Sequence, residues 1–384
     1  MQVKQIYTIM NDITKEVVGD TVVVNEDLSN IVDVGNAIFG ATNVDNYVRT
    51  LVDHIGRVIF VDRVYSGSVP SVLRDGWEYG SVLEKIQAEL PEAKVNESWD
   101  LQDGQSYDPN VFYKPVVSAK FFNSKVTFEV DLSFTEKQVK ESFSNAQQLN
   151  GFISMLYNSV DKSMTIKIDA LVKRTINNFT AETLHEAFSG GDISSGSTAR
   201  AVNLLYLYNQ QFGTTLTADK ALTTPEFMRF ASYVMATYID YMKEASKVFN
   251  IGGKVRFTPK DMLNVVMLSQ FANSSKMYLQ SDTYWKELVS LPNADTIAFW
   301  QGSGQDYEFS ATSKIDVKTA QGHTVEASGI LAVMFDRDAL GVCNQDRRVT
   351  TNYNPKAEFF TNFYKFDCSY FNDEDENFVV FYVA

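Results

Sequence analysis

The stretch GILAVMFDRDALGV, residues 329–342, joins an uninterrupted apolar run to a short charged segment. The apolar residues LAVMF are followed directly by Asp336, Arg337 and Asp338. A short apolar run bounded in this way predicts a buried β-strand. Two aspartates at the end of such a strand suit a divalent metal ion, but they also suit the edge of a structural sheet. The rest of the chain has to decide between these two interpretations.

Composition predicts a large folded core and argues against a surface that binds nucleic acid. The 384 residues are 45% hydrophobic and 21% charged, without a long low-complexity tract. The formal net charge is −14 and the chain has no cluster of five or more Lys and Arg residues, so tight direct binding to nucleic acid is not expected. An acidic wall would instead suit a container that must not adhere to a polyanion inside it.

The chain shows no signal for secretion or membrane insertion. Its start, MQVKQIYTIMNDITKEVVGD, lacks a cationic stretch followed by an apolar run, and no segment approaches the roughly 18–20 apolar residues that span a bilayer. The two cysteines, Cys343 and Cys368, form no Cys-x-x-Cys unit and are expected to be small buried residues in a reducing compartment. We therefore expect a soluble protein that is made inside a cell.

Residues 66–130 form a turn-rich excursion with β-type sequence at its end. The segment holds two of the four tryptophans and leads into VFYKPVVSAKFFNSKVTFEVDLSF, which is rich in β-branched and aromatic residues. This pattern predicts a long two-stranded excursion. Because an isolated two-stranded ribbon is only marginally stable in water, it would need another surface to lie on, such as a neighbouring subunit.

A long helix is expected after this excursion. Thr135 and Gln138 form a capping-box pattern that marks a helix start. From Leu149 onward, apolar residues keep helical spacing over roughly 30 residues without a proline, or about 45 Å. We expect the following stripe to face a core: Phe152, Ile153, Leu156, Val160, Met164, Ile168, Leu171, Val172 and Ile176.

The remaining segments predict short alternating elements. Helical spacing from Leu51 to Ile59 precedes a predicted strand, VIFVDRVY. Further elements are a Gly/Ser-rich loop at 188–200, a strand at 202–208, a helix from Pro225, a helix start at Thr258-Pro259, a short helix at 281–289, and β-type sequence at the end that surrounds the acidic, hairpin-like turn NDEDEN.

Motifs for catalysis are weak throughout the chain. The three histidines, His54, His185 and His323, are scattered, and the sequence around Gly252-Gly253-Lys254 lacks the other residues of a phosphate-binding loop. The Asp336-x-Asp338 pair has no accompanying phosphate-cradling loop, and Arg337 can neutralise one of its carboxylates. We therefore expect no enzyme activity, no cofactor and no bound metal.

Residues 329–384 resemble the C-terminal region of tailed-phage major capsid proteins of the Hong Kong 97-type fold. The resemblance rests on a strand that ends in Asp-Arg-Asp-Ala, the polar link RRVTT…NP, aromatic strands, and a terminus of Glu-Asn followed by apolar residues. VNLLYLYNQQFGTTLTADKALTTPEFMRFASYVM and TPKDMLNVVMLSQFANSSKMYLQSDTYWKELV are similar to the middle of capsid proteins from phages of Gram-positive bacteria. VDHIGRVIFVDRVY is similar to the entry into the extended loop, so the resemblance covers most of residues 45–384.

The resemblance implies an α+β fold with five parts. An N-terminal arm and lead-in would occupy 1–62, and an extended β loop that lies on an adjacent subunit would occupy 63–130. The later parts would be a peripheral domain with a long spine helix at 131–183, an axial domain around the five-fold and six-fold axes at 184–345, and a return to the peripheral domain at 346–384.

The resemblance also implies a function. The chain would be the major capsid protein of a small, short-tailed phage of a Gram-positive host. It would self-assemble through pentamers and hexamers into the icosahedral shell that encloses double-stranded DNA, without sequence-specific binding. Expected partners are copies of itself, a portal and, where one is required, a scaffolding protein. No association with a membrane is expected. The protein would be assembled in the bacterial host cytoplasm and remain in the virion.

Subunit contacts supply the candidate site residues. Aromatic side chains are natural anchors at such contacts. The candidates in the extended loop are Trp77, Tyr79, Trp99, Tyr107 and Phe112. Within this fold, the opening charged segment, Asp336, Arg337 and Asp338, is expected to pair internally or with neighbouring subunits instead of binding a metal.

Two other interpretations stay open on the sequence. A cellular nanocompartment shell of the encapsulin type would share the fold, but it would have a groove for cargo peptides and usually a shorter chain. A metal-dependent glycosyltransferase would use Asp336 and Asp338 to hold a divalent metal ion against a nucleotide diphosphate.

Overall fold

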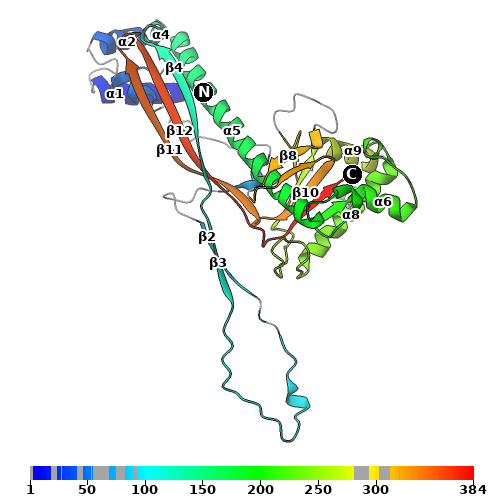
Figure 1. Cartoon of the computed structure of the whole chain (residues 1–384). Helices are drawn as coiled ribbons and strands as arrows, with labels where there is room; N and C mark the ends of the chain where they lie inside the picture. The colour runs from blue at the N-terminus through cyan, green and yellow to red at the C-terminus, as the bar shows by residue number, and fades with distance from the viewer. Residues whose placement is uncertain are drawn as a thin grey trace. The chain divides into compact units, whose positions relative to one another are not determined.

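The computed structural model describes residues 3–18, 24–26, 28–40, 46–52, 54, 69–74, 83–89, 91, 93–144, 146–280, 294–301, 312–319 and 321–384. Two compact units make up the chain (Figure 1). Unit 1 consists of Met1–Gly80, Lys125–Lys173 and Val342–Ser369, and unit 2 consists of Ser81–Ser124, Arg174–Gly341 and Tyr370–Ala384. Each unit is therefore built from segments that lie far apart in the sequence.

Unit 1 is organised around a four-stranded sheet in the order β1-β11-β12-β4. These strands are β1 (Leu73–Arg74), β11 (Leu340–Asn354), β12 (Phe359–Asn372) and β4 (Lys125–Thr135). β12 and β4 run antiparallel in unbroken register from Phe359 opposite Thr135 to Ser369 opposite Lys125. Short helices complete the unit: α1 (Val3–Val18), α2 (Ile31–Gly40), η1 (Pro70–Val72) and α4 (Glu136–Ser142).

Alternation along β12 buries one face of this sheet. Phe360, Asn362, Tyr364, Phe366 and Cys368 are buried, while the residues between them are only partly covered. The period of two follows from the pleat of a β-strand, which points successive side chains to opposite faces. Cys368 and Cys343 are both buried, as the sequence predicted, and neither is part of a disulfide.

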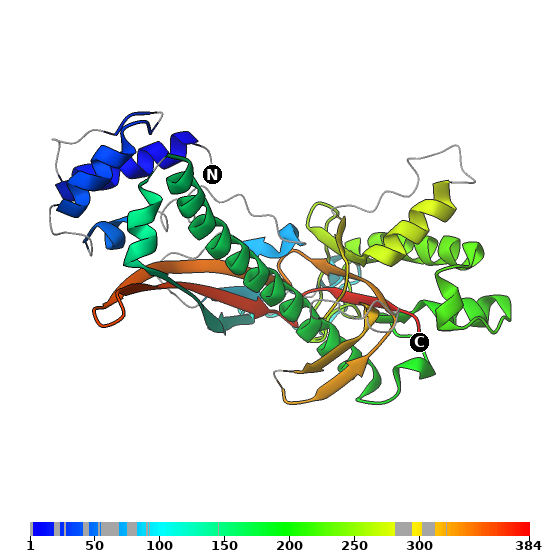
Figure 2. The same ribbon diagram turned by 90° about the horizontal axis from the view of Figure 1, so that it is seen from above.

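The helix α5 (Ala146–Phe188) has 43 residues and runs from unit 1 into unit 2 (Figures 1 and 2). The predicted stripe is confirmed, because all of its residues from Ile153 to Ile176 are buried, and only Phe152 is partly covered. The predicted cap is also present before α4: the Thr135 hydroxyl accepts from the Gln138 amide, and the Gln138 side chain accepts from the Thr135 amide. None of the described helices is long and apolar enough to cross a membrane.

Unit 2 contains a five-stranded sheet in the order β5-β13-β10-β6-β7. The central strand, β10 (Ile330–Asp336), is the apolar run of the opening motif, and every residue in it is buried. It runs antiparallel to β13 on one side and to β6 on the other. The other strands are β5 (Ala201–Asn203), β13 (Phe378–Tyr382), β6 (Leu263–Leu268) and β7 (Ala294–Ile297).

Helices and two small sheets complete unit 2. The helical elements are η3 (Glu97–Trp99), η4 (Ile193–Ser195), α6 (Leu204–Phe212), α7 (Ala218–Ala221), α8 (Pro225–Lys243) and α9 (Ser269–Gln280). The small sheets pair β2 (Leu83–Ala88) with β3 (Val117–Phe122), and β8 (Ile315–Lys318) with β9 (Thr324–Ala327). Pro225 occupies the first turn of α8, as its position in the sequence predicted.

Two sequence predictions of local structure are wrong. The predicted strand at 202–208 is a three-residue strand followed by α6, because the Asn203 side chain accepts from the Tyr206 amide and caps the helix. The expected helix start at Thr258-Pro259 is a turn that leads into β6, where β-branched residues lie between two neighbouring strands. The expected strand VIFVDRVY and helix at 281–289 lie outside the described residues.

The C-terminal segment also needs a correction. The acidic turn, Asp373–Asn377, does not form a hairpin, because β12 belongs to the sheet of unit 1 and β13 to the sheet of unit 2. Residues 346–384 are divided between the two units after Ser369, and their assignment to a peripheral domain stays a prediction. The sequence pattern identified β12 and β13 as strands, but it could not reveal that these consecutive strands belong to different sheets.

Buried apolar volume on α5 should dominate the stability of unit 1. We expect Ile168→Ala to lower the free energy of unfolding by about 2–5 kcal/mol, because the side chain is fully buried and its loss leaves a cavity. Ile166→Ala is the matched control: this side chain is 66% exposed, so its truncation should change stability by no more than about 0.5 kcal/mol. Denaturant unfolding followed by circular dichroism tests this, and equal effects would contradict the assignment of the buried face.

Gly329 should tolerate no side chain. It has φ +76, and a Cβ atom there would lie 1.9 Å from the Val383 carbonyl oxygen. We expect Gly329→Ala to destabilise unit 2 by more than the about 1–2 kcal/mol that left-handed backbone alone costs. Gly104→Ala is the control, because Gly104 has φ +85 but a Cβ atom there meets nothing within 4 Å. Thermal unfolding that affects both variants equally would disprove the steric argument.

Candidate functional site

The extended loop, residues 89–116, exposes apolar side chains to an unusual degree. Every side chain described between residues 93 and 117 is exposed. The large apolar residues among them are Val95, Trp99, Leu101, Tyr107, Val111, Phe112, Tyr113, Val116 and Val117. In Figure 1 the loop continues from the ends of β2 and β3 as an open arc. Large apolar side chains exposed in such number on one segment indicate an interaction site.

Three of the aromatic candidates predicted from the sequence lie in this loop. Trp99 is 98% exposed, Phe112 is 84% exposed and Tyr107 is 47% exposed. Their part in a subunit contact stays a prediction, and their exposure is compatible with it. Trp77 and Tyr79 lie outside the described residues. Sequence reasoning overlooked Tyr113 and Leu101, although both are exposed in the same turn-rich stretch.

The ribbon formed by β2 and β3 carries the loop and has one half-buried face. Lys85 of β2 lies directly opposite Lys120 of β3 in the antiparallel register. Both lysines belong to the half-buried face. Like charges directly opposite each other destabilise a strand pair, so the ribbon needs an anionic partner on this face.

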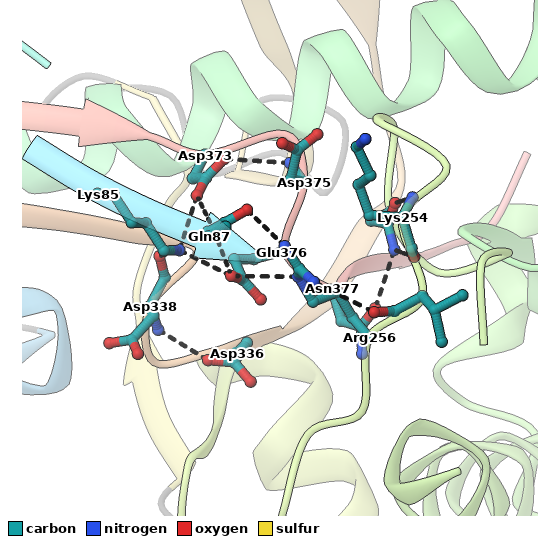
Figure 3. A network of polar contacts seen from close by, with 12 residues as sticks. Lys85, Gln87, Lys254, Arg256, Asp336, Asp338, Asp373, Asp375, Glu376 and Asn377 are labelled. Atoms are coloured by element: carbon teal, nitrogen blue, oxygen red, sulfur yellow. Dashed lines mark hydrogen bonds and ion pairs between the residues drawn. The ribbon is translucent and has the colours of Figure 1, made fainter. Parts of the chain in front are cut away.

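The acidic turn supplies that partner (Figure 3). The Asp373 carboxylate, which has no exposed side-chain surface, accepts from Lys85 Nζ at 2.7 Å and from Lys120 Nζ at 2.9 Å. Lys85 also lies 2.7 Å from Glu376, and Lys120 lies 2.6 Å from Asp375. Three carboxylates of one turn thus neutralise two lysines from the two strands of the ribbon.

The two lysines shift the pKa of the Asp373 carboxyl. Burial raises the pKa of the Asp373 carboxyl, but the hydrogen bonds and charges of Lys85 and Lys120 outweigh burial and hold the pKa below its usual value. Because the folded pKa is depressed, the ionised carboxylate stabilises the fold above its usual pKa, and this contribution is lost as the pH falls through the depressed value. At Glu376 burial prevails over Lys85 and raises the pKa.

A second set of contacts holds the outgoing strand of the ribbon. The Gln87 amide nitrogen donates to Asp373 at 3.3 Å and to Glu376 at 3.1 Å, and its oxygen accepts from the Arg256 guanidinium. Lys254 forms an ion pair with Glu89, at the end of the ribbon where the extended loop begins. The segment at 254–256 therefore braces the ribbon from a third part of the chain.

The opening motif lies beside this cluster, and its first aspartate is structural. Asp336 is 4% exposed; its carboxylate accepts from the Thr258 hydroxyl and from the Asp338 amide, each at 2.8 Å. Burial raises the pKa of this carboxyl. Arg337 is exposed and Asp338 is half-buried. A contact of these three residues with a neighbouring subunit stays a prediction, and exposure favours Arg337 over Asp336.

The two turns that change sheets are hydrogen-bonded to each other. The Asp373 amide donates to the Ala339 carbonyl at 2.7 Å, and the Asp336 amide donates to the Asn377 carbonyl at 2.9 Å. Lys85 Nζ also lies 3.4 Å from the Asp338 carbonyl oxygen. The ribbon is thus fixed to both turns at once. Among the described residues, no group of three or more His, Cys, Asp and Glu side chains could hold a metal ion.

Comparison with known proteins agrees with this architecture. The major capsid protein of Bacillus phage GA-1 is 25% identical over 165 residues, which cover 41% of this chain but only 33% of that protein, so the alignment spans about a third of its length. Among solved structures, the capsid structure of Staphylococcus phage Andhra gives a TM-score of 0.53 at 10% identity and covers 84% of this chain and 86% of that chain. The structure of head fiber and inner core protein gp22 of native bacteriophage P68 gives a TM-score of 0.53 at 9% identity, with the same coverage of both chains.

These structural similarities establish the fold, an α+β capsid fold of the Hong Kong 97 type. The family is established separately, from the sequence. The family model for the Phi29-like phage major capsid protein matches residues 8–382, which is nearly the whole chain. The chain therefore belongs to the family of Phi29-like phage major capsid proteins.

Proposed function

We propose that this chain self-assembles through pentamers and hexamers into the icosahedral shell of a short-tailed phage of a Gram-positive host. The observation that carries the proposal is the extended loop, which exposes eight large apolar side chains on a segment with almost no packing of its own: Val95, Trp99, Leu101, Tyr107, Val111, Phe112, Tyr113 and Val116. Docking on an adjacent subunit would remove this surface from water.

The energetic basis of assembly would be the repetition of this contact. Burying one large apolar side chain completely is worth about 1.5–3 kcal/mol, and a few aromatic anchors carry most of the energy of a typical interface. Each subunit would offer one loop and receive another, so every contact in the shell would be made many times. Small differences in the same contact would allow both pentamers and hexamers.

The two units take distinct parts in the proposal. Unit 1, with its long sheet and the first part of α5, would be the peripheral domain, and unit 2 without its ribbon would be the axial domain near the five-fold and six-fold axes. The shell would enclose double-stranded DNA without sequence-specific binding, and the net charge of −14 would keep its walls from adhering to that DNA.

Partners and location follow from this role. The shell would contain a portal and, where assembly requires one, would form on a scaffolding protein in the host cytoplasm. The chain would have no catalytic activity. The Asp336 carboxylate accepts hydrogen bonds from the Thr258 hydroxyl and the Asp338 amide within the subunit. This arrangement gives no support to a metal-dependent transferase that would use Asp336 and Asp338.

Purified full-length protein should form closed particles as its concentration rises. Sedimentation velocity should show a single large species beside free subunits, and negative-stain electron microscopy should show hollow shells. A chain that remains monomeric under every assembly condition, including the presence of a scaffolding protein, would disprove the proposed function.

The exposed aromatic residues of the loop should control assembly without supporting the fold. We expect the double variant Trp99→Ala/Phe112→Ala to raise the protein concentration needed for assembly by about tenfold or more, because truncating an interface anchor costs about 2 kcal/mol or more. Its thermal unfolding should be unchanged, since both side chains are exposed in the subunit.

Two matched variants control this experiment. Gln102→Ala/Asn110→Ala alters polar side chains of the same loop and should leave assembly nearly unchanged, and Trp99→Phe keeps an aromatic anchor and should lie close to the wild type. If the polar variant impairs assembly as much as the aromatic one, the anchors have been assigned to the wrong side chains.

A further inference from the structure

The direction of the extended loop is decided at its base. The side chains described from 93 to 117 are exposed, so the loop has little packing by which to orient itself. The ribbon below it packs through one face only, and that face carries Lys85 and Lys120 opposite each other. Whatever holds these two lysines therefore also holds the loop.

We propose that Asp373, Lys85 and Lys120 form an electrostatic latch that fixes the ribbon against the acidic turn and so aims the extended loop at its docking site. The role of the latch in aiming the loop at a neighbouring subunit rests on the proposed function. The contact that fixes the ribbon against the acidic turn concerns the isolated subunit alone. The three residues act as positioning residues, because they hold the element that makes the subunit contact.

Burial makes the latch strong. If the ribbon moved away, the Asp373 carboxylate, which has no exposed side-chain surface in the closed position, would lose both of its cations. Removing the partners of a buried charge is strongly unfavourable. The two lysines would lose their shared anion and repel each other across the strand pair. Closing the latch therefore compensates the buried carboxylate of Asp373 and removes the repulsion between Lys85 and Lys120 with one set of contacts. A partly open ribbon would have neither benefit in full.

The neighbouring groups reinforce the closed position. Besides Asp373, Glu376 forms an ion pair with Lys85 and Asp375 forms one with Lys120. Gln87 of β2 donates to Glu376, and Arg256 forms an ion pair with the same carboxylate. Lys254 forms an ion pair with Glu89 at the start of the loop. These contacts come from the acidic turn and from the segment at 254–256, so two separate parts of the chain hold the ribbon. Figure 3 shows Lys85, Gln87 and Arg256 around Glu376.

The latch can be measured in dilute, unassembled full-length subunits. Spin labels on Asp103→Cys in the loop and Lys318→Cys in β8 report the loop direction by double electron–electron resonance, since both native cysteines are buried. Hydrogen exchange reports the ribbon amides at 83–88 and 117–122. We expect Lys85→Met/Lys120→Met to broaden the distance distribution and to speed ribbon exchange by about tenfold or more, the loss expected from removing charge-assisted hydrogen bonds.

Control variants separate the latch from general destabilisation. Lys85→Arg/Lys120→Arg keeps both charges and should stay close to the wild type. Lys365→Met removes an ion pair with Glu129 in unit 1 and should change neither readout. Exchange of the amides in β10 and β13 should remain slow in all variants. If the double methionine variant unfolds unit 2, the single variant Lys120→Met is used for both measurements instead. The Lys120 side chain is 35% exposed, so it is easier to replace.

Two outcomes would overturn the latch, and a third concerns assembly only. An unchanged distance distribution in the methionine variants, or equal broadening in the arginine variant, contradicts it. With the latch intact and the proposed function correct, the methionine variant should also lose closed shells although Trp99 and Phe112 are present. If the subunit readouts change as expected but wild-type protein never assembles, the latch stands and the proposed function fails.

Discussion

A buried carboxylate has to be compensated by positive charge, and at Asp373 the compensation comes from a separate element of the chain. Lys85 and Lys120 reach this carboxylate from the two strands of the ribbon, so neither the ribbon nor the acidic turn is electrostatically satisfied without the other. The same turn is hydrogen-bonded to the turn that follows β10. Placing the base of the extended loop is therefore part of folding unit 2.

The cluster lies where the chain changes from one sheet to the other. β10 and β13 are neighbours in the sheet of unit 2, while β11 and β12 are neighbours in the sheet of unit 1. Both turns between these pairs are rich in aspartate, because a turn that joins different sheets must satisfy backbone groups that a hairpin would pair by itself. Asp336 does this for the Asp338 amide, and its carboxylate also accepts from the Thr258 hydroxyl, which explains the opening motif without a metal.

Local signals predicted the elements that depend on local chemistry. The capping box at Thr135 and the apolar stripe of α5 are both confirmed, because each is decided by residues within one or two turns of chain. The strand expected at 202–208 is wrong because Asn203 begins a helix there. The exposed aromatic residues of the loop could also be identified, since the turn-rich sequence around them offers no core in which to bury them.

The sequence by itself determined the fold class, the long helix, the strand that precedes Asp336 and, through the order of its segments, a resemblance to capsid proteins that the family match confirms. Only the tertiary structure decided which strands share a sheet and which charges meet. Lys85 and Asp373 lie 288 positions apart, and a lysine at an alternating position of a strand looks the same whether it faces water or a carboxylate. Periodicity records which side of an element is buried, but the partner on that side depends on how distant segments pack.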